Sequence, residues 1–342
     1  MSALVPPRIG EAERGAVPTF SIAIAAYDVA DRIGSALESA FAQTLAPLEV
    51  VVCDDASTDE LESALAPYRE RIRCLRHEQN RGEAAAKNTA ARAASGEFVV
   101  ILDADDIFHP TRLEALGELA AERPDLDVLT TDAYLVADGQ ILRRCYEPYW
   151  PFVTDDQRRG ILERNFIFGL AAVRRERLLE IGGFDETIRW TTDWDCWIRL
   201  IFSGSQAGLV SEPLAEYRLR ETSLSSDRAK HVSGRAATLA KAARMPSLTD
   251  AERETVQRTL AEQKSLLALE EAHAAIESGA ADARARAIGI AQDRRYGSGT
   301  RAKAALAAAA PSLVARVGRA RRRRTWIGPG DIPIPRRAQP DE

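Results

Sequence analysis

The chain has 342 residues, 45% of them hydrophobic and 28% charged, a composition typical of a globular protein with one main domain and a smaller appendage. The net charge of -5 argues against a nucleic-acid-binding protein, whose charge is usually basic, so no nucleic-acid partner is expected. No apolar run approaches the roughly 20 residues of a membrane-spanning helix, and the N-terminus lacks the apolar core of a signal peptide. We therefore expect a cytoplasmic protein.

From residue 19 onward, short apolar runs alternate with helical patterns. Strands are predicted at 20–26, 48–53, 72–77, 98–102 and 127–134, and helices at 31–43, 58–68, 83–94 and 111–122. Strands that alternate with helices of about 10 to 15 residues indicate an α/β fold with a mostly parallel, Rossmann-like sheet that is flanked by helices.

The second half of the chain is first irregular and then helical. Residues 140–225 are rich in aromatic side chains, whereas Ala, Arg, Glu and Leu dominate after about residue 230. Thr249 and Glu252 have the spacing of a capping box, and the helix that they begin is expected to end at Gly279. The sequence thus predicts a flexible leader (1–18), an α/β domain (19–228), a helical C-terminal region (229–320) and a basic, proline-rich tail (321–342).

Polar and acidic residues follow three of the predicted strands. Tyr27 and Asp28 follow the first strand, residues 54–59 (DDASTD) the second, and residues 103–106 (DADD) the fourth. Ligands bind outside the carboxyl ends of parallel strands, so these segments are expected to meet at one edge of the sheet. Carboxylates gathered there repel one another unless a cation compensates. Mg or Mn, bound between these carboxylates and a nucleotide diphosphate, is the expected compensator.

The order and spacing of these segments resemble those of family 2 glycosyltransferases, which have the GT-A fold. The resemblance continues through residues 80–82 (NRG), 86–88 (AKN), 94–97 (ASGE), 182–186 (GGFDE), 192–197 (TDWDCW), 217–218 (YR) and 223–225 (SLS). It covers roughly residues 19–226 and leaves the helical C-terminal region out. It implies a metal-dependent, inverting transfer of a sugar from a nucleotide-diphospho-sugar, by default a UDP-sugar, to a saccharide or lipid-linked acceptor. Synthesis of bacterial-type cell-surface polysaccharide or glycan is the implied setting.

The resemblance also implies roles for single residues. Contacts with the nucleotide-sugar are implied for Ala25, Tyr27, Asp54, Asp55, Lys87, Asp103 and Arg220. Within this set, Ala25, Tyr27 and Asp55 would contact the nucleobase and Asp103 the ribose. Asp105 is the implied metal ligand, with Asp106 as the second candidate. Asp193 is the implied general base. Trp194 would either touch the acceptor sugar or pack in the core.

Three positions depart from the family pattern. Lys87 stands where the family usually has arginine, which keeps the charge but loses the bidentate fork. Thr192 replaces the acid that usually precedes the base. Arg220 stands where the family often has histidine. A guanidinium cannot bind a metal but can hold phosphate, so Arg220 is predicted to clamp the diphosphate.

Several residues have structural interpretations as well. Gly182 and Gly183 indicate a tight turn that needs a permissive backbone, and Asp195 is expected to brace its own helix. The tail from Leu313 to Arg324 contains six arginines. It is either a solvated basic segment or a contact with anionic lipid at the inner face of the plasma membrane.

Parts of the sequence also fit two other functions. An apolar strand that leads into DxD also occurs in haloacid-dehalogenase phosphatases, but their pattern requires Thr or Val where this chain has Ile107. A catalytically degenerate GT-A domain that acts as a sugar-binding or scaffold protein is the second alternative, and Thr192 and Arg220 are its support. No GxGxxG follows the first strand, which disfavours a dinucleotide-binding dehydrogenase.

Overall fold

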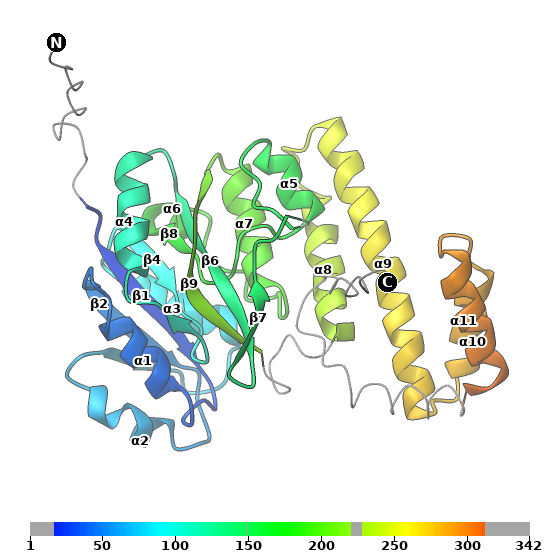
Figure 1. The fold of residues 1–342 in the computed structure, drawn as a ribbon, viewed down its shortest axis with the longest axis horizontal. Coiled ribbons are helices and arrows are strands. Elements are labelled where there is room, and N and C mark those ends of the chain that lie inside the picture. The colour runs from blue at the N-terminus through cyan, green and yellow to red at the C-terminus, as the bar shows by residue number, and fades with distance from the viewer. Residues whose placement is uncertain (1–16, 149, 220–227, 312–342) are drawn as a thin grey trace, which may run out of the picture.

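The computed structural model describes residues 17–148, 150–219 and 228–311 (Figure 1). The first half of the chain contains the predicted alternation of strands and helices. In chain order its elements are β1 (Phe20–Ala26), α1 (Ile33–Phe41), β2 (Glu49–Asp54), α2 (Leu61–Leu65), the 3-10 helix η1 (Ala66–Tyr68), β3 (Arg73–Arg76), α3 (Glu83–Ala93), β4 (Phe98–Ile101), β5 (Ile107–Phe108), α4 (Arg112–Glu122) and β6 (Val128–Ala137). The short strand β5 was not predicted.

The region that the sequence left irregular forms β7 (Gln140–Arg144), α5 (Gln157–Glu163), β8 (Ala172–Arg174), α6 (Arg175–Glu180), α7 (Thr192–Phe202) and β9 (Ala207–Leu219). Among the described residues, nine strands form one sheet in the order β3-β2-β1-β4-β8-β6-β9-β5, with β7 paired to β6. Strand β1 is parallel to β2 and β4, and β2 is parallel to β3. Beyond β4 the sheet becomes mixed, because β8 runs antiparallel to both β4 and β6.

Helices cover both faces of the parallel half of the sheet. Successive side chains of β1, β2 and β4 point to opposite faces, and both sets are largely apolar and buried. Ile22 and Ile24 of β1 face a core that α1, α2 and α4 complete, whereas Ala23 between them faces a second core with α3, α5 and α7. Valine residues of β2 and β4 divide between the two cores in the same way. A strand that is buried on both faces therefore has a continuous run of apolar residues in its sequence.

The C-terminal helices are α8 (Arg228–Ala242), α9 (Asp250–Ser278), α10 (Ala283–Gln292) and α11 (Ser298–Ala309). They lie together on one side of the α/β part, with α8 next to α7 (Figure 1). The predicted capping box is confirmed: the Thr249 hydroxyl accepts from the amide of Glu252, whose carboxylate accepts from the amide of Thr249. Gly279 ends α9 in the left-handed conformation, as predicted. No helix of the described ranges is both long and apolar enough to cross a membrane.

The predicted turn at Gly182 and Gly183 lies against α3, and the segment that follows it leads into α7. Gly182 and Gly183 have φ angles of 83° and 81°. The side chain of Asn88, buried in α3, accepts from the amide of Phe184 at 2.7 Å and donates to the carbonyl of the same residue at 2.8 Å. A Cβ atom on Gly183 would lie 2.3 Å from Asn88 Oδ1, whereas a Cβ atom on Gly182 would meet nothing within 4 Å.

The two glycines provide a matched test of this contact. Both substitutions to alanine place a side chain at positive φ, which costs about 1–2 kcal/mol. Gly183→Ala should in addition displace Asn88 and lose its buried hydrogen bonds, each worth about 1–3 kcal/mol when a partner is left unsatisfied. Urea unfolding should therefore show a larger loss of stability for Gly183→Ala than for Gly182→Ala. Equal losses would contradict the role given to Asn88.

Candidate active site

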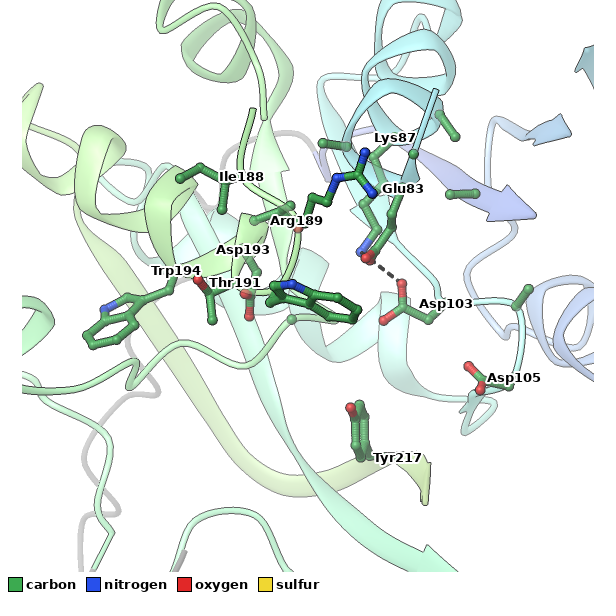
Figure 2. Close-up of a pocket in the computed structure, with 18 of the residues that line it drawn as sticks. Glu83, Lys87, Asp103, Asp105, Ile188, Arg189, Thr191, Asp193, Trp194 and Tyr217 are labelled. Atoms are coloured by element: carbon green, nitrogen blue, oxygen red, sulfur yellow. Dashed lines mark hydrogen bonds and ion pairs between the residues drawn. The ribbon is translucent and has the colours of Figure 1, made fainter. Parts of the chain in front are cut away.

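A cavity of about 840 Å³ opens at the carboxyl ends of β1, β2 and β4 and reaches across to the start of α7 (Figure 2). Most of the residues that the sequence predicted for the site line this one cavity: Ala25, Tyr27, Asp55, Lys87, Asp103, Asp105, Asp193 and Trp194. The first six come from the sheet edge and from α3, and the last two from α7. Residues far apart in sequence thus meet as the parallel arrangement requires.

Two predicted residues do not line the cavity, and a third lies outside the described residues. Asp54 is buried and accepts from the amide of Ser57 and the guanidinium of Arg76, so it shapes the loop after β2. Asp106 is also buried, and its Oδ1 accepts from the amide of Arg218 at 2.8 Å while Oδ2 has no hydrogen-bond partner among the described residues. Burial raises the pKa of Asp106, and the nearby charges of Asp105 and Asp103 raise it further. Arg220 lies in the segment that the structure does not describe.

Asp55 fixes the entrance of α3. Its Oδ1 accepts from the amide of Arg81 at 2.9 Å and its Oδ2 from the amide of Gly82 at 2.7 Å. His77 Nδ1 lies 2.6 Å from Oδ1 as well. The three contacts fill three of the roughly four lone-pair sites of the carboxylate, so one acceptor position remains beyond these contacts.

Lys87 compensates the negative charge of the cavity wall. Its ammonium is 2.5 Å from a carboxylate oxygen of Glu83 and 2.9 Å from Asp103 Oδ1, and the side chain is only 4% exposed (Figure 2). Burial alone lowers the pKa of Lys87, but the two carboxylates outweigh it and raise the pKa above its ordinary value. Lys87 therefore remains charged at neutral pH. Glu83 was not predicted, although it lies one helical turn before Lys87.

Asp103 and Asp105 supply oxygen ligands suited to a hard divalent cation. Among the described residues, no group of three or more His, Cys, Asp or Glu side chains is placed to hold a metal ion. Mg²⁺ is commonly held by one or two carboxylates together with substrate phosphates. The residues present therefore fit a metal that binds with its phosphate ligand rather than a resident metal in a complete protein cage.

Asp193 lies in the first turn of α7, on the opposite wall from Asp103 (Figure 2). Asn165 donates to its Oδ2 at 2.9 Å and so fixes the orientation of the carboxylate. Burial raises the pKa of Asp193 above its ordinary value, and the positive charge of Lys87 offsets part of this effect. A raised pKa makes the ionised carboxylate a stronger base.

The neighbouring residues of α7 serve the fold. Trp194 is 1% exposed and donates its indole N–H to the carbonyl of Ile161 at 2.7 Å, so its ring packs in the core at the cavity wall. Asp195 braces its helix as expected, with Arg199 at 2.7 Å, and it also pairs with Lys241 at 2.7 Å. The cavity wall includes aromatic and basic residues that the sequence analysis did not assign to the site: Trp150, Arg189, Trp190, His231 and Arg235.

Comparison with known proteins identifies the family of this chain. The model of the family described as Glycosyl transferase family 2 matches residues 21–182. A Bacillus subtilis protein named as the teichuronic acid biosynthesis glycosyltransferase TuaG is 31% identical over 217 residues, which cover 62% of this chain and 84% of TuaG. The chain belongs to glycosyltransferase family 2. This confirms the resemblance on which the predicted roles rest.

Solved structures support the fold of this family 2 glycosyltransferase. Staphylococcus aureus TarS 1-349 in complex with UDP matches it with a TM-score of 0.56 and 18% sequence identity, over 88% of this chain and 92% of that one. The mannosyltransferase PcManGT from Pyrobaculum calidifontis, in complex with GDP-Man and Mn²⁺, matches with a TM-score of 0.57 and 21% identity, over 91% and 82% of the two chains. The predicted GT-A fold with C-terminal helices is thereby confirmed.

The raised pKa of Asp193 predicts that its ionised carboxylate lowers the stability of the fold at neutral pH. A carboxyl group whose pKa is raised on folding contributes stability at pH values below its unfolded pKa and loses that contribution as pH rises through the folded value. At pH 7 the charged Asp193 is therefore destabilising. Asp193→Asn should raise the Tm at pH 7, and the difference from the parent should shrink toward pH 4. A lower Tm at pH 7 would contradict the burial cost assigned to this carboxylate.

Proposed function

We propose that this enzyme transfers a sugar from a nucleotide-diphospho-sugar, by default a UDP-sugar, to a saccharide or lipid-linked acceptor with inversion. One observation carries the proposal: a single cavity places Asp193 across from Asp103 and Asp105, with Tyr27 and Asp55 at the sheet edge. A role in polysaccharide synthesis is supported by the name of the relative TuaG.

The donor would lie along the sheet edge. Tyr27 and the backbone of Ala25 would contact the nucleobase, with Asp55 at its polar edge and Asp103 at the ribose. TarS and PcManGT were solved with UDP and with GDP-Man, which supports a nucleotide ligand for this fold. Lys87 already pairs with Asp103 and Glu83. We therefore propose that Lys87 holds these two carboxylates beside the donor and does not itself contact the phosphates.

A divalent cation would be held by Asp105 and Asp103 together with the donor diphosphate. When bound, it would stabilise the negative charge that develops on the leaving diphosphate. Mn²⁺ in the PcManGT complex supports this assignment. We do not assign Asp106 to the metal, because its carboxyl group is buried away from the cavity and holds the backbone of β9.

Asp193 would act as the general base. An acceptor hydroxyl is a weak nucleophile until a positioned group takes its proton. The Asp193 carboxylate, oriented by Asn165, would accept that proton as the hydroxyl oxygen attacks the anomeric carbon. A single displacement inverts this carbon and needs only one such carboxylate, whereas a retaining double displacement would need a second nucleophile.

Release of nucleoside diphosphate from a panel of nucleotide-sugars, with and without Mn²⁺, tests the proposal. The parent should release nucleoside diphosphate from at least one donor, and Asp193→Asn should lower kcat for transfer by about 10² to 10⁴, the usual contribution of general-base catalysis. Asp282→Asn is the matched control, since it makes the same chemical change at an exposed pair with Arg286 on α10. Unchanged transfer by Asp193→Asn would exclude Asp193 as the base.

A further inference from the structure

Helix α8 forms ion pairs and a hydrogen bond with residues 185–195, the segment that contains the proposed general base Asp193. Lys241 of α8 pairs with Asp185 at 2.5 Å and with Asp195 at 2.7 Å. The hydroxyls of Thr238 and Thr191 lie 2.8 Å apart, and Thr191 is the residue at the start of α7. The hydrogen bonds from Lys241 and Thr187 overcome the effect of burial and lower the pKa of Asp185 to about 2. Contacts at both ends of the 185–195 segment thus hold α8 close to the proposed general base Asp193.

Between these contacts, α8 packs so closely that it shares the cavity wall. A Cβ atom on Gly234 would lie 2.6 Å from the Cβ of Trp190. His231 and Arg235, one helical turn apart on the same face of α8, both line the cavity. The family model ends at residue 182, and α8 lies outside both the model match and the resemblance described above.

The wall formed by α8 and the 188–191 segment is basic and aromatic. Arg189 lines the cavity and has no hydrogen-bond or ion-pair partner in the described part of the chain (Figure 2). The Arg235 guanidinium carbon lies 5.6 Å from the Trp194 ring centroid, and Lys230 Nζ lies 5.5 Å from that of Trp190. Glu186 on the same wall already pairs with Arg81 at 3.0 Å.

His231 adds an uncharged polar group to this wall. Burial, with a contribution from the positive charge of Arg235, lowers the pKa of His231 to about 4. The imidazole is therefore neutral at pH 7, and it makes no hydrogen bond with other described residues. A neutral imidazole offers one donor and one acceptor, which suits sugar hydroxyls. An aromatic face such as that of Trp190 suits the apolar face of a sugar ring.

We propose that α8 and the 188–191 segment form the acceptor subsite, and that Arg189 and Arg235 bind a carboxylate or phosphate group on an acceptor saccharide. This proposal rests on the function proposed above. Arg189 and Arg235 line the same cavity as Asp193, so an anionic group on the acceptor that binds them would hold the acceptor in the part of the cavity that contains the proposed base. Charge-assisted hydrogen bonds from arginine to carboxylate or phosphate are strong and geometrically specific.

Matched acceptor pairs test the proposal on the full-length enzyme with its best donor. One pair is an oligosaccharide with a terminal uronic acid and the same oligosaccharide with that carboxylate reduced to an alcohol. The other is a terminally phosphorylated oligosaccharide and its dephosphorylated form. The parent should show at least a tenfold higher kcat/KM for the anionic member of one pair, and the pair that responds identifies the anion. Added salt should weaken the preference.

Variants then assign the preference to the subsite. Arg189→Ala, which removes an exposed side chain, and Arg235→Gln should each reduce the preference to less than threefold, mainly through KM for the anionic member. Arg235→Lys should retain part of it. Arg284→Ala, an exposed substitution on α10 outside the cavity, should keep the full preference of the parent and serves as the control.

Three results would overturn the proposal: equal use of both members of each pair by the parent, donor turnover without transfer to any anionic member, or a preference that survives both Arg189→Ala and Arg235→Gln. A parent that releases nucleoside diphosphate from no donor would instead contradict the proposed glycosyl transfer.

Discussion

A buried ammonium between two carboxylates organises the cavity. Lys87 pairs with Glu83 of its own helix and with Asp103 after β4, and so joins α3 to the edge of the sheet where the negative groups gather. Parallel strands bring their carboxyl ends together, and the acids that follow them would repel one another without a positive charge nearby. Lys87 supplies part of that compensation within the protein. The remaining compensation at Asp103 and Asp105 is what a divalent cation on a diphosphate would provide.

Helix α3 extends this organisation to the other wall. Asp55 holds the residues just before α3 through the amides of Arg81 and Gly82, and Asn88 holds the backbone of Phe184 beyond the glycine turn. From there the chain runs to Asp185, which Lys241 links to Asp195 of α7. The proposed donor edge and the proposed general base Asp193 are thus connected through α3, the glycine turn and α8. Their spacing is set by buried hydrogen bonds and ion pairs rather than by the sheet alone.

The sequence predicted the parallel half of the sheet because its strands are continuous apolar runs separated by helical patterns. The sequence did not predict β8 and β9. The length of β9 depends on its pairing with β6, and the register of this pairing shifts near Asp132. Adjacent acids could not be separated by pattern either: Asp55 and Asp105 line the cavity, whereas Asp54 and Asp106 beside them are buried elsewhere. His231 and Arg235 follow no motif, and only the packing of α8 on the 185–195 segment brings them to the site.

In the proposed function, the carboxylates at the sheet edge hold a divalent cation against a nucleoside diphosphate. A crystal structure with UDP and Mn²⁺, in which manganese is located by its anomalous scattering, would show whether these carboxylates bind the cation. We expect manganese bound to Asp105 or Asp103 and to the diphosphate, with the uracil ring near Tyr27 and Asp55 and the β-phosphate directed toward Asp193. Manganese or UDP bound outside this cavity, or UDP bound with neither carboxylate in contact with manganese, would contradict it.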